Sequence, residues 1–240
     1  FMRLYLRPFW SCHYFKQFKY PQRGFPASGL VIGSEDWRTA WAGLLEKIKL
    51  DQLEVLKRTR SGDVLGGEIV LGGATVPFIL KRPRRKHWYR YINEIGRGGR
   101  ARRAWKKAWS LIARDIPTAW PLALMERRIL GYVVDQIILF ERVPGVTLDQ
   151  CDLDALPPDA RYRLFARAGR LLRRLEEDGL YHYDAKSSNW IVRPDDMLGP
   201  TPVLIDVDGI RRVRWIALGI QRLLLSMRAQ PKYTPADSLA

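Results

Sequence analysis

The chain has 240 residues, of which 47% are hydrophobic and 28% are charged, so it can fold around a core and wholesale disorder is excluded. Its formal net charge is +16, and its two cysteines, Cys12 and Cys151, exclude a disulfide-rich secreted scaffold. This cysteine usage, without a secretory pattern, predicts a cytoplasmic protein.

The positive charge is concentrated in three segments. Residues 81–107 contain twelve Lys and Arg against Glu94 alone, a net charge of +11, and residues 211–232 contain six basic residues and no acid. Residues 1–33 carry five basic residues, no acid and nine aromatic residues. Such clustering predicts a polyanionic partner: a nucleic acid, an anionic membrane face or a phosphorylated substrate. A solvated basic surface is the simpler alternative.

The start of the chain predicts an irregular segment followed by a helix. Residues 1–33 show no clean period and contain three prolines, so we expect an aromatic and basic arm. Ser34 is placed to cap a helix over about 35–49. Its apolar residues fall on one face, namely Trp37, Trp41, Leu44, Leu45 and Ile48.

From residue 53 the pattern changes to β-rich runs separated by glycine-containing turns. Three antiparallel strands are expected at Leu53–Arg60, Glu68–Leu71 and Val76–Lys81. The expected turns are Ser61–Asp63, Gly66–Gly67 and Gly72–Gly73. A helix over 100–114 and two further strands at Leu122–Glu126 and Tyr132–Phe140 follow, ending at a Pro-Gly hinge in Glu141–Gly145.

The second half predicts a helical region that encloses two short strands. Pro157–Asp178 has apolar residues at helical spacing and ends before Gly179. Strands are expected at Trp190–Val192 and Val203–Ile205. A last helix is expected to have one apolar face, which is formed by Ile216, Ile220, Leu223, Leu224 and Met227.

The strongest chemical signal lies between residues 182 and 209. The run His182-Tyr-Asp-Ala-Lys-Ser-Ser-Asn189 precedes Asp206-Val-Asp-Gly209. Phosphoryl transfer from a nucleotide needs a carboxylate that orients the acceptor hydroxyl, together with oxygen ligands for Mg²⁺. Each of these residues alone has a plain structural explanation, but their order and spacing favour a kinase.

The candidate roles follow from residue type. Asp184 fits the acceptor-orienting carboxylate, and Lys186 is placed to neutralise charge on the transferring phosphoryl group. His182 is the third candidate of the catalytic segment. The candidate metal ligands are Asn189, Asp206 and Asp208.

Lys81 is the nucleotide-binding candidate of the first half. It ends the third expected strand, where protein kinases have the lysine that pairs with the α- and β-phosphates of ATP. The alternative is one more basic residue in a basic run. Ala104 stands where the following helix is expected to supply a partner glutamate, and Glu94 precedes that helix. Gly96–Gly99 is expected to be a linker rather than a nucleotide loop.

With these residues the chain resembles the sugar kinases of the lipopolysaccharide core, the Kdo and heptose kinases of the protein-kinase-like superfamily. The likeness covers about residues 53–228, and it rests also on Ile116–Arg128 and on the D-x-D-G at Asp206–Gly209. The resemblance implies ATP, Mg²⁺, nucleotide contacts at Glu141 and Val143, and a sugar hydroxyl of a membrane-associated glycolipid as acceptor. The chain departs from kinases in lacking G-x-G-x-x-G, for which Ser61-Gly62-Asp63 is a short substitute.

The expected fold is therefore α+β: a kinase-like fold with a small antiparallel-sheet N-lobe and a reduced helical C-lobe. The expected parts are an extension with a helix at 1–49, an N-lobe at 50–142 and a C-lobe at 143–240. The alternative function is a pseudokinase or basic interaction module that binds anionic membranes or nucleic acid. No recognised nucleic-acid motif supports the last partner.

A peripheral position at the inner face of the cell membrane is the expected localisation. Aromatic residues suit the headgroup boundary, and basic residues suit an anionic leaflet. The arm at 1–33 combines both, and the basic segment at 81–107 adds charge. The alternative is that the aromatic residues of the arm extend the core.

Overall fold

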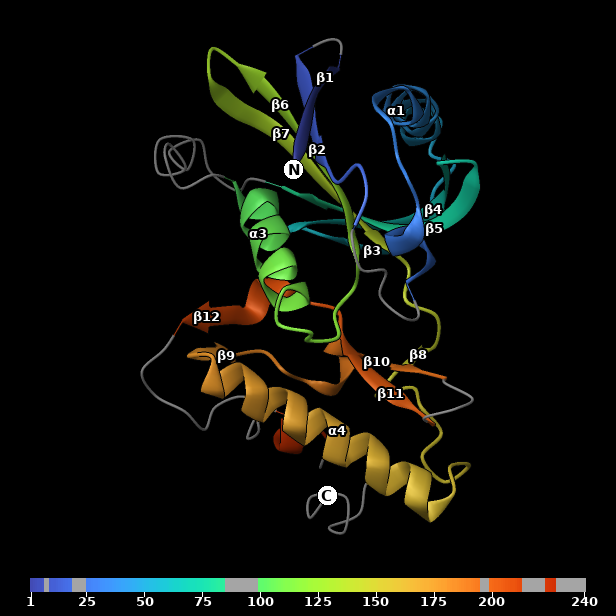
Figure 1. Cartoon of the computed structure of the whole chain (residues 1–240), viewed down its shortest axis with the longest axis vertical. Coiled ribbons are helices and arrows are strands. Elements are labelled where there is room, and N and C mark those ends of the chain that lie inside the picture. The colour runs from blue at the N-terminus through green and yellow to red at the C-terminus, as the bar shows by residue number, and fades with distance from the viewer. Residues whose placement is uncertain (7–8, 19–24, 85–98, 195–198, 213–222, 228–240) are drawn as a thin grey trace. The chain divides into compact units, whose positions relative to one another are not determined.

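A computed structural model of the chain describes residues 1–6, 9–18, 25–84, 99–194, 199–212 and 223–227 (Figure 1). The chain forms two compact units. Unit 1 comprises Phe1–Lys106 and Trp120–Arg142, and unit 2 comprises Lys107–Ala119 and Val143–Ala240. Residues 1–49 thus belong to the same unit as the strands that follow them, although the sequence indicated a separate extension.

Unit 1 is built on a seven-stranded antiparallel sheet with the order β1-β2-β6-β7-β5-β4-β3. The expected antiparallel sheet is confirmed, and it is larger than the sequence indicated. The strands are β1 (Met2–Leu6), β2 (Trp10–Tyr14), β3 (Glu54–Thr59), β4 (Gly62–Leu71), β5 (Ala74–Pro83), β6 (Pro121–Ile129) and β7 (Tyr132–Glu141).

The expectation of an irregular segment is wrong for Met2–Leu6 and Trp10–Tyr14, which form β1 and β2. On β2, Trp10, Cys12 and Tyr14 share one buried face, and Ser11 on the opposite face is buried as well. On β1, Leu4 and Leu6 are buried in the same way. The strands are only five residues long, too short for their period to stand out, and β2 is stabilised by pairing with β6 more than a hundred residues later.

The expected turn at Gly66–Gly67 is also wrong, because both glycines lie inside β4. Their neighbours explain the residue type. A Cβ on Gly67 would lie 2.9 Å from Leu53 Cδ2 and 3.0 Å from Phe78 Cζ, and one on Gly66 would lie 2.8 Å from Glu54 Oε2. Glycine here makes room for side chains of neighbouring strands rather than reversing the chain.

Two helices lie between strands of this sheet along the chain, one between β2 and β3 and the other between β5 and β6. Helix α1 (Ser34–Lys49) begins after Gly33, whose N–H donates to Asp36 Oδ2 at 2.6 Å, so the cap is Gly33 rather than Ser34. The Trp37 and Trp41 rings of α1 contact Tyr14 and Trp10 of β2, at centroid distances of 6.0 and 4.8 Å. Helix α3 (Arg100–Ile112) begins where the Gln136 side chain accepts the Ala101 N–H at 2.9 Å.

Unit 2 packs α4 (Pro158–Glu177) with two small sheets. β10 (Trp190–Arg193) pairs with β8 (Val146–Thr147) and with β11 (Thr201–Leu204), while β9 (Leu180–His182) pairs with β12 (Ile210–Arg212). Two 3-10 helices, η2 (Ser187–Asn189) and η3 (Val207–Gly209), lie in the predicted site segment. The expected helix and both expected strands are confirmed.

The α+β fold class is confirmed. Among the described residues, no helix has the length and apolar character needed to cross a bilayer. Part of the last expected helix is present, since residues 223–227 are helical with Leu223 and Met227 buried. Ile216 and Ile220 lie outside the described residues, as do Glu94 and most of the basic segment at 81–107.

Two glycine-to-alanine substitutions, compared with each other, test the packing of unit 1. Gly43 lies within α1 and a Cβ there would meet nothing within 4 Å, so Gly43→Ala should stabilise the protein by about 0.5–1 kcal/mol. Gly67→Ala should destabilise it by about 1–3 kcal/mol, because Phe78 and Leu53 must move. Denaturant unfolding of both variants measures the difference, and equal effects would contradict the packing.

Candidate functional site

The predicted catalytic segment forms a loop between β9 and β10, here called the acceptor loop (residues 182–189). His182 ends β9 and Asn189 ends η2. Both are buried, whereas Asp184 is half-buried and Lys186 is exposed. The loop therefore presents its carboxylate and its ammonium group outward from a fixed base.

His182 joins the acceptor loop to the turn at Asp206. Its Nε2 lies 2.6 Å from the carbonyl oxygen of Asp206, and its Nδ1 lies 3.2 Å from the backbone nitrogen of Asp184. Since Nδ1 accepts the Asp184 N–H, the ring proton sits on Nε2 and is donated to Asp206. Burial is the main cause that lowers the pKa of His182, so the imidazole is neutral.

The glycine of the D-x-D-G motif is explained by the same ring. A Cβ on Gly209 would lie 2.8 Å from His182 Nδ1 and still closer to Cε1, so no larger residue fits against the imidazole. The Gly209 carbonyl accepts the Tyr183 N–H at 3.1 Å, and Ile210 pairs with His182 between β12 and β9. The acceptor loop and the D-x-D-G turn are thus fastened together at several points.

Asn189 fixes the backbone and the carboxylate of Asp184. Its Nδ2 donates to the Asp184 carbonyl oxygen at 2.7 Å and to Oδ2 at 3.3 Å. The amide nitrogen is therefore committed to the loop, which leaves the amide oxygen as its free acceptor group. Trp190 Nε1 donates to the Ala185 carbonyl oxygen at 3.1 Å and closes the base of the loop.

Lys186 and Asp184 form an ion pair, with Nζ 3.2 Å from Oδ2. Their side chains are 48% and 34% exposed, so solvent weakens the pair and both groups remain accessible to a ligand. The structure therefore brings together the three candidate residues Asp184, Lys186 and Asn189, which the sequence predicted to lie in one site.

The D-x-D-G turn is held from two sides within unit 2. Asp206 Oδ1 accepts the Asp208 N–H at 3.3 Å and caps η3. The Asp208 carbonyl oxygen accepts hydrogen bonds from Lys107 Nζ at 3.0 Å and from Arg211 Nη1 at 2.6 Å. Lys107 is a contact that sequence reasoning missed, because it lies a hundred residues earlier in a run of basic residues.

The donor set suits a magnesium ion that is also bound by phosphates. Within the described ranges, no three His, Cys, Asp or Glu side chains are grouped closely enough to hold a metal by themselves. Asn189 and Asp206 instead offer an amide and a carboxylate oxygen, the hard ligands that Mg²⁺ takes one or two at a time beside substrate phosphates and water. The residues present fit Mg²⁺ with a nucleotide rather than a metal cage.

The nucleotide-binding candidates of unit 1 have different surroundings. Lys81 lies on β5 opposite Ile138 of β7, with Nζ 5.6 Å from the centroid of the Phe140 ring. Helix α3 contains no acidic residue that is able to pair with it. Val143 is buried and belongs to unit 2, so the candidate hinge residues Glu141 and Val143 fall in different units.

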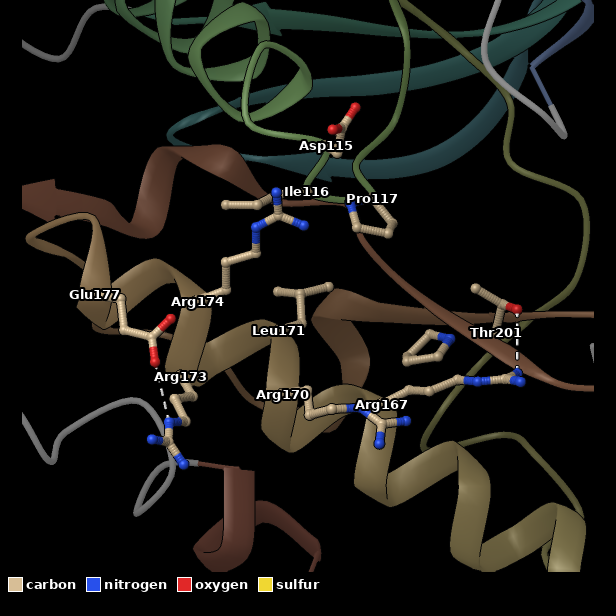
Figure 2. A pocket seen from close by; sticks show the side chains of 11 residues that line it. Asp115, Ile116, Pro117, Arg167, Arg170, Leu171, Arg173, Arg174, Glu177 and Thr201 are labelled. Carbon is tan, nitrogen blue, oxygen red and sulfur yellow. Dashed lines mark hydrogen bonds and ion pairs between the residues drawn. The ribbon is translucent and has the colours of Figure 1, made fainter.

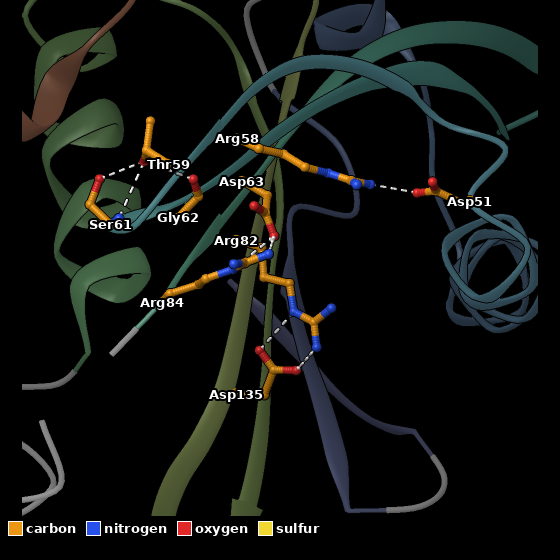
Figure 3. Close-up of polar contacts among 9 residues, drawn as sticks. All are labelled: Asp51, Arg58, Thr59, Ser61, Gly62, Asp63, Arg82, Arg84 and Asp135. Atoms are coloured by element: carbon orange, nitrogen blue, oxygen red, sulfur yellow. Dashed lines mark hydrogen bonds and ion pairs between the residues drawn. The ribbon is translucent and has the colours of Figure 1, made fainter. Parts of the chain in front are cut away.

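The turn between β3 and β4, where kinases have a glycine-rich loop, is short and internally bonded (Figure 3). Thr59 Oγ1 accepts the Ser61 N–H at 3.3 Å and donates to the Gly62 carbonyl oxygen at 3.0 Å. The Ser61 carbonyl oxygen accepts the Arg84 N–H at 3.0 Å, and the Arg84 side chain pairs with Asp63 at 2.8 Å. The turn is therefore closed by its own side chains and by the pairing of Arg84 with Ser61 and Asp63.

Buried charges in unit 1 form a network that the sequence did not reveal. Glu126 on β6 accepts hydrogen bonds from Arg102 of α3 and from Arg128, the latter at 3.0 Å. Burial opposes ionisation, but these guanidinium groups keep the pKa of Glu126 below its usual value. Burial and then Arg102 lower the pKa of His13 to about 4, so its neutral ring bonds to Arg102 at 3.1 Å.

Unit 2 also contains a cavity of about 650 Å³ lined by arginines of α4 (Figure 2). None of the predicted site residues lines it. Arg167 donates to the Pro200 carbonyl oxygen at 2.9 Å, and Arg173 pairs with Glu177 at 3.1 Å. Arg170 and Arg174 complete the positive lining. The sequence indicated α4 only as an amphipathic helix.

Comparison with known proteins identifies the fold. No protein-family model and no curated protein matches the chain. A solved structure described as WaaP in complex with acyl carrier protein is 18% identical, with a TM-score of 0.56, and the match covers 85% of this chain and 83% of that chain. At this identity the likeness shows the fold alone, and it confirms the expected kinase-like fold.

Glu141 predicts a pH dependence of stability. It is buried with Oε1 accepting the Ala27 N–H at 3.2 Å, and burial raises its pKa from 4.5 to about 7. The folded state therefore prefers the protonated acid, and this contribution to stability is complete below pH 4.5 and is lost as the pH rises to about 7.

Glu141→Gln removes this loss while keeping the acceptor oxygen. The variant should gain stability over the wild type as the pH rises from 4.5 to 7, reaching on the order of 3 kcal/mol. His13 titrates in the opposite sense, so the measured quantity is the difference in unfolding free energy between variant and wild type at each pH. A difference that stays constant would contradict the buried carboxylic acid.

Proposed function

We propose that the protein is an ATP-dependent kinase that phosphorylates a sugar hydroxyl of a membrane-associated glycolipid, such as the lipopolysaccharide core. The observation that carries the proposal is the fastening of the acceptor loop to the D-x-D-G turn through His182. It gives one unit both a carboxylate for the acceptor and oxygen ligands for a metal on the donor phosphates.

In this proposal Asp184 touches the acceptor hydroxyl and Lys186 the transferring phosphoryl group. The carboxylate accepts the hydroxyl proton as the oxygen bonds to the γ-phosphorus of ATP, and the bond from that phosphorus to the β–γ bridging oxygen breaks so that ADP leaves. Their 3.2 Å ion pair holds the two groups ready at neighbouring positions and opens when substrates arrive. His182 is a positioning residue, because both of its ring nitrogens are used by the backbone.

Asn189 and Asp206 would hold Mg²⁺, with Asp208 as the further candidate. When bound, the ion neutralises charge on the nucleotide phosphates. Asn189 aligns its own oxygen by anchoring its nitrogen to Asp184. Lys81 would contact the α- and β-phosphates, and the backbone at Glu141 and Val143 would receive the nucleotide base.

The acceptor class rests on the family resemblance, and the structural neighbour supports the fold that accompanies it. The WaaP structure shares this fold, and its complex with acyl carrier protein is a property of that protein. The net charge of +16 suits an anionic acceptor at the inner face of the cell membrane. A pseudokinase or basic interaction module is the second candidate, favoured by the absence of any acidic residue in α3.

Asp184→Asn tests the function directly. The substitution retains the shape and the backbone hydrogen bonds of the loop but removes the group that accepts the hydroxyl proton. Phosphoryl transfer should fall by roughly 10²–10⁴ while ATP binding is retained. Asp154→Asn, at a side chain of unit 2 that is 61% exposed, is the matched control and should be fully active. Wild-type turnover by Asp184→Asn would show that Asp184 is not the proton acceptor, whereas no turnover by any form would favour the second candidate.

Asp206→Asn tests the metal site without removing the cap on η3, because an Asn oxygen also accepts the Asp208 N–H. The variant should lose most of the magnesium-dependent gain in ATP affinity and keep the affinity measured in chelator. Isothermal titration over a series of magnesium concentrations gives both values. Identical magnesium curves for variant and wild type would rule out Asp206 as a ligand.

A further inference from the structure

Phe9 and the turn between β6 and β7 lie at one end of the sheet of unit 1, and each presents a large apolar side chain to solvent. Phe9 precedes β2, and Leu130 lies between β6 and β7. Because β2 and β6 are paired, with Trp10 opposite Arg127, Phe9 and the β6–β7 turn lie at the same end of the sheet (Figure 1). The Arg128 N–H donates to the Phe9 carbonyl oxygen at 3.0 Å and joins them. Phe9 and Ile129–Tyr132 are here called the hairpin tips.

The side chains that the hairpin tips expose to solvent are unusually large and apolar. Leu130 is 93% exposed and Phe9 is 68% exposed, and Ile129 and Tyr132 are also exposed. On the neighbouring β1, Tyr5 is 68% exposed as well. Single exposed apolar residues are common on proteins, but five large ones on or beside the four neighbouring strands β1, β2, β6 and β7 form a patch that solvation does not favour.

The backbone makes the choice of these residues more unfavourable still. Phe9 has φ 61° and Leu130 has φ 48°, the left-handed region that bulky residues rarely occupy. Leu130 and Gly131, with φ 82°, are the two loop residues of the β6–β7 hairpin. A loop with two positive φ values favours Asn-Gly. Leucine is therefore costly here both in conformation and in exposure, which indicates a function outside the fold.

The charge around the hairpin tips is positive. Arg127 and Arg128 immediately precede Ile129, and Arg3 of β1 lies over the Tyr5 ring at 4.8 Å. The nearest acid on β6, Glu126, is buried and neutralised by Arg102 and Arg128. β1 and β2 contain no acidic residue. Asp135 of β7 lies opposite Arg127 and pairs with Arg82 at 2.5 Å, so this carboxylate is engaged as well, and guanidinium groups border the apolar tips.

We propose that the hairpin tips insert into an anionic membrane surface. Leu130 and Phe9 would enter the boundary between headgroups and acyl chains, while the rings of Tyr5 and Tyr132 suit the headgroup level. The neighbouring arginines complement anionic lipid phosphates.

This surface differs from the whole aromatic arm that the sequence indicated. Trp10, Tyr14 and Phe25 of the arm are buried and belong to the core of unit 1. Leu130, by contrast, comes from a hairpin more than a hundred residues away. The proposal deepens the proposed function, since a glycolipid acceptor requires the enzyme to reach a membrane.

The test is vesicle binding by the full chain, with Leu130→Asn and Phe9→Asn as variants. Vesicles of phosphatidylglycerol and phosphatidylethanolamine should bind the wild type, and vesicles of phosphatidylcholine should not. Each substitution should weaken binding by roughly ten-fold, because an inserted apolar side chain is lost. Asparagine tolerates positive φ, so the melting temperature should stay the same or rise, which separates the effect from misfolding.

Leu50→Asn is the matched control, because Leu50 of unit 1 is 58% exposed and lies outside the hairpin tips. It should bind anionic vesicles as the wild type does. Equal binding by wild type and both tip variants would overturn the proposal, as would a tip-dependent dimer without vesicle binding. Asp184→Asn should bind vesicles normally, so failure of the kinase proposal and failure of this one are distinguishable.

Discussion

The site in unit 2 depends on one buried imidazole. His182 donates from Nε2 to the Asp206 carbonyl oxygen and accepts the Asp184 N–H at Nδ1, so a single neutral ring sets the backbone on both sides of the site. Protonation would turn its acceptor nitrogen into a donor facing another donor. Burial keeps the pKa of His182 below its usual value and so prevents this conflict near neutral pH. Gly209 follows from the same ring, because only glycine lets the D-x-D-G turn approach it.

Unit 1 handles its buried carboxylates in two opposite ways. Glu126 stays ionised because Arg102 and Arg128 surround it, which ties α3 to β6 by charge. Glu141 has one backbone donor and no described cation, so burial raises its pKa instead. Glu141 lies on β7 directly before Arg142, the last residue of unit 1. The chain therefore carries, where it leaves this unit, an acid that is protonated at pH values below about 7 and needs no buried counter-ion in that form.

The sequence predicted the elements that local pattern determines, and it missed those that distant contacts determine. The spacing from His182 to Gly209 was sufficient to expect a loop and a turn that act together, since the chemistry itself constrains that spacing. Local rules treat paired glycines as breakers and predict a turn at Gly66–Gly67, whereas Leu53 and Phe78 require a residue without a side chain inside the strand at Gly67. β1 and β2 were missed because their stability comes from β6, which no local period reports.

The same reasoning explains why the aromatic residues near the start of the chain have two fates. Once β2 pairs with β6, alternation directs Trp10 and Tyr14 toward α1, where their rings meet Trp41 and Trp37. The residues that the alternation and the turns leave outside are those with no partner in the core, Tyr5 and Phe9 among them. Pairing with β6 also brings the Leu130 turn beside Phe9. Two apolar residues that the linear sequence separates by more than a hundred positions thus become one surface, created by the same strand pairing that completes the core.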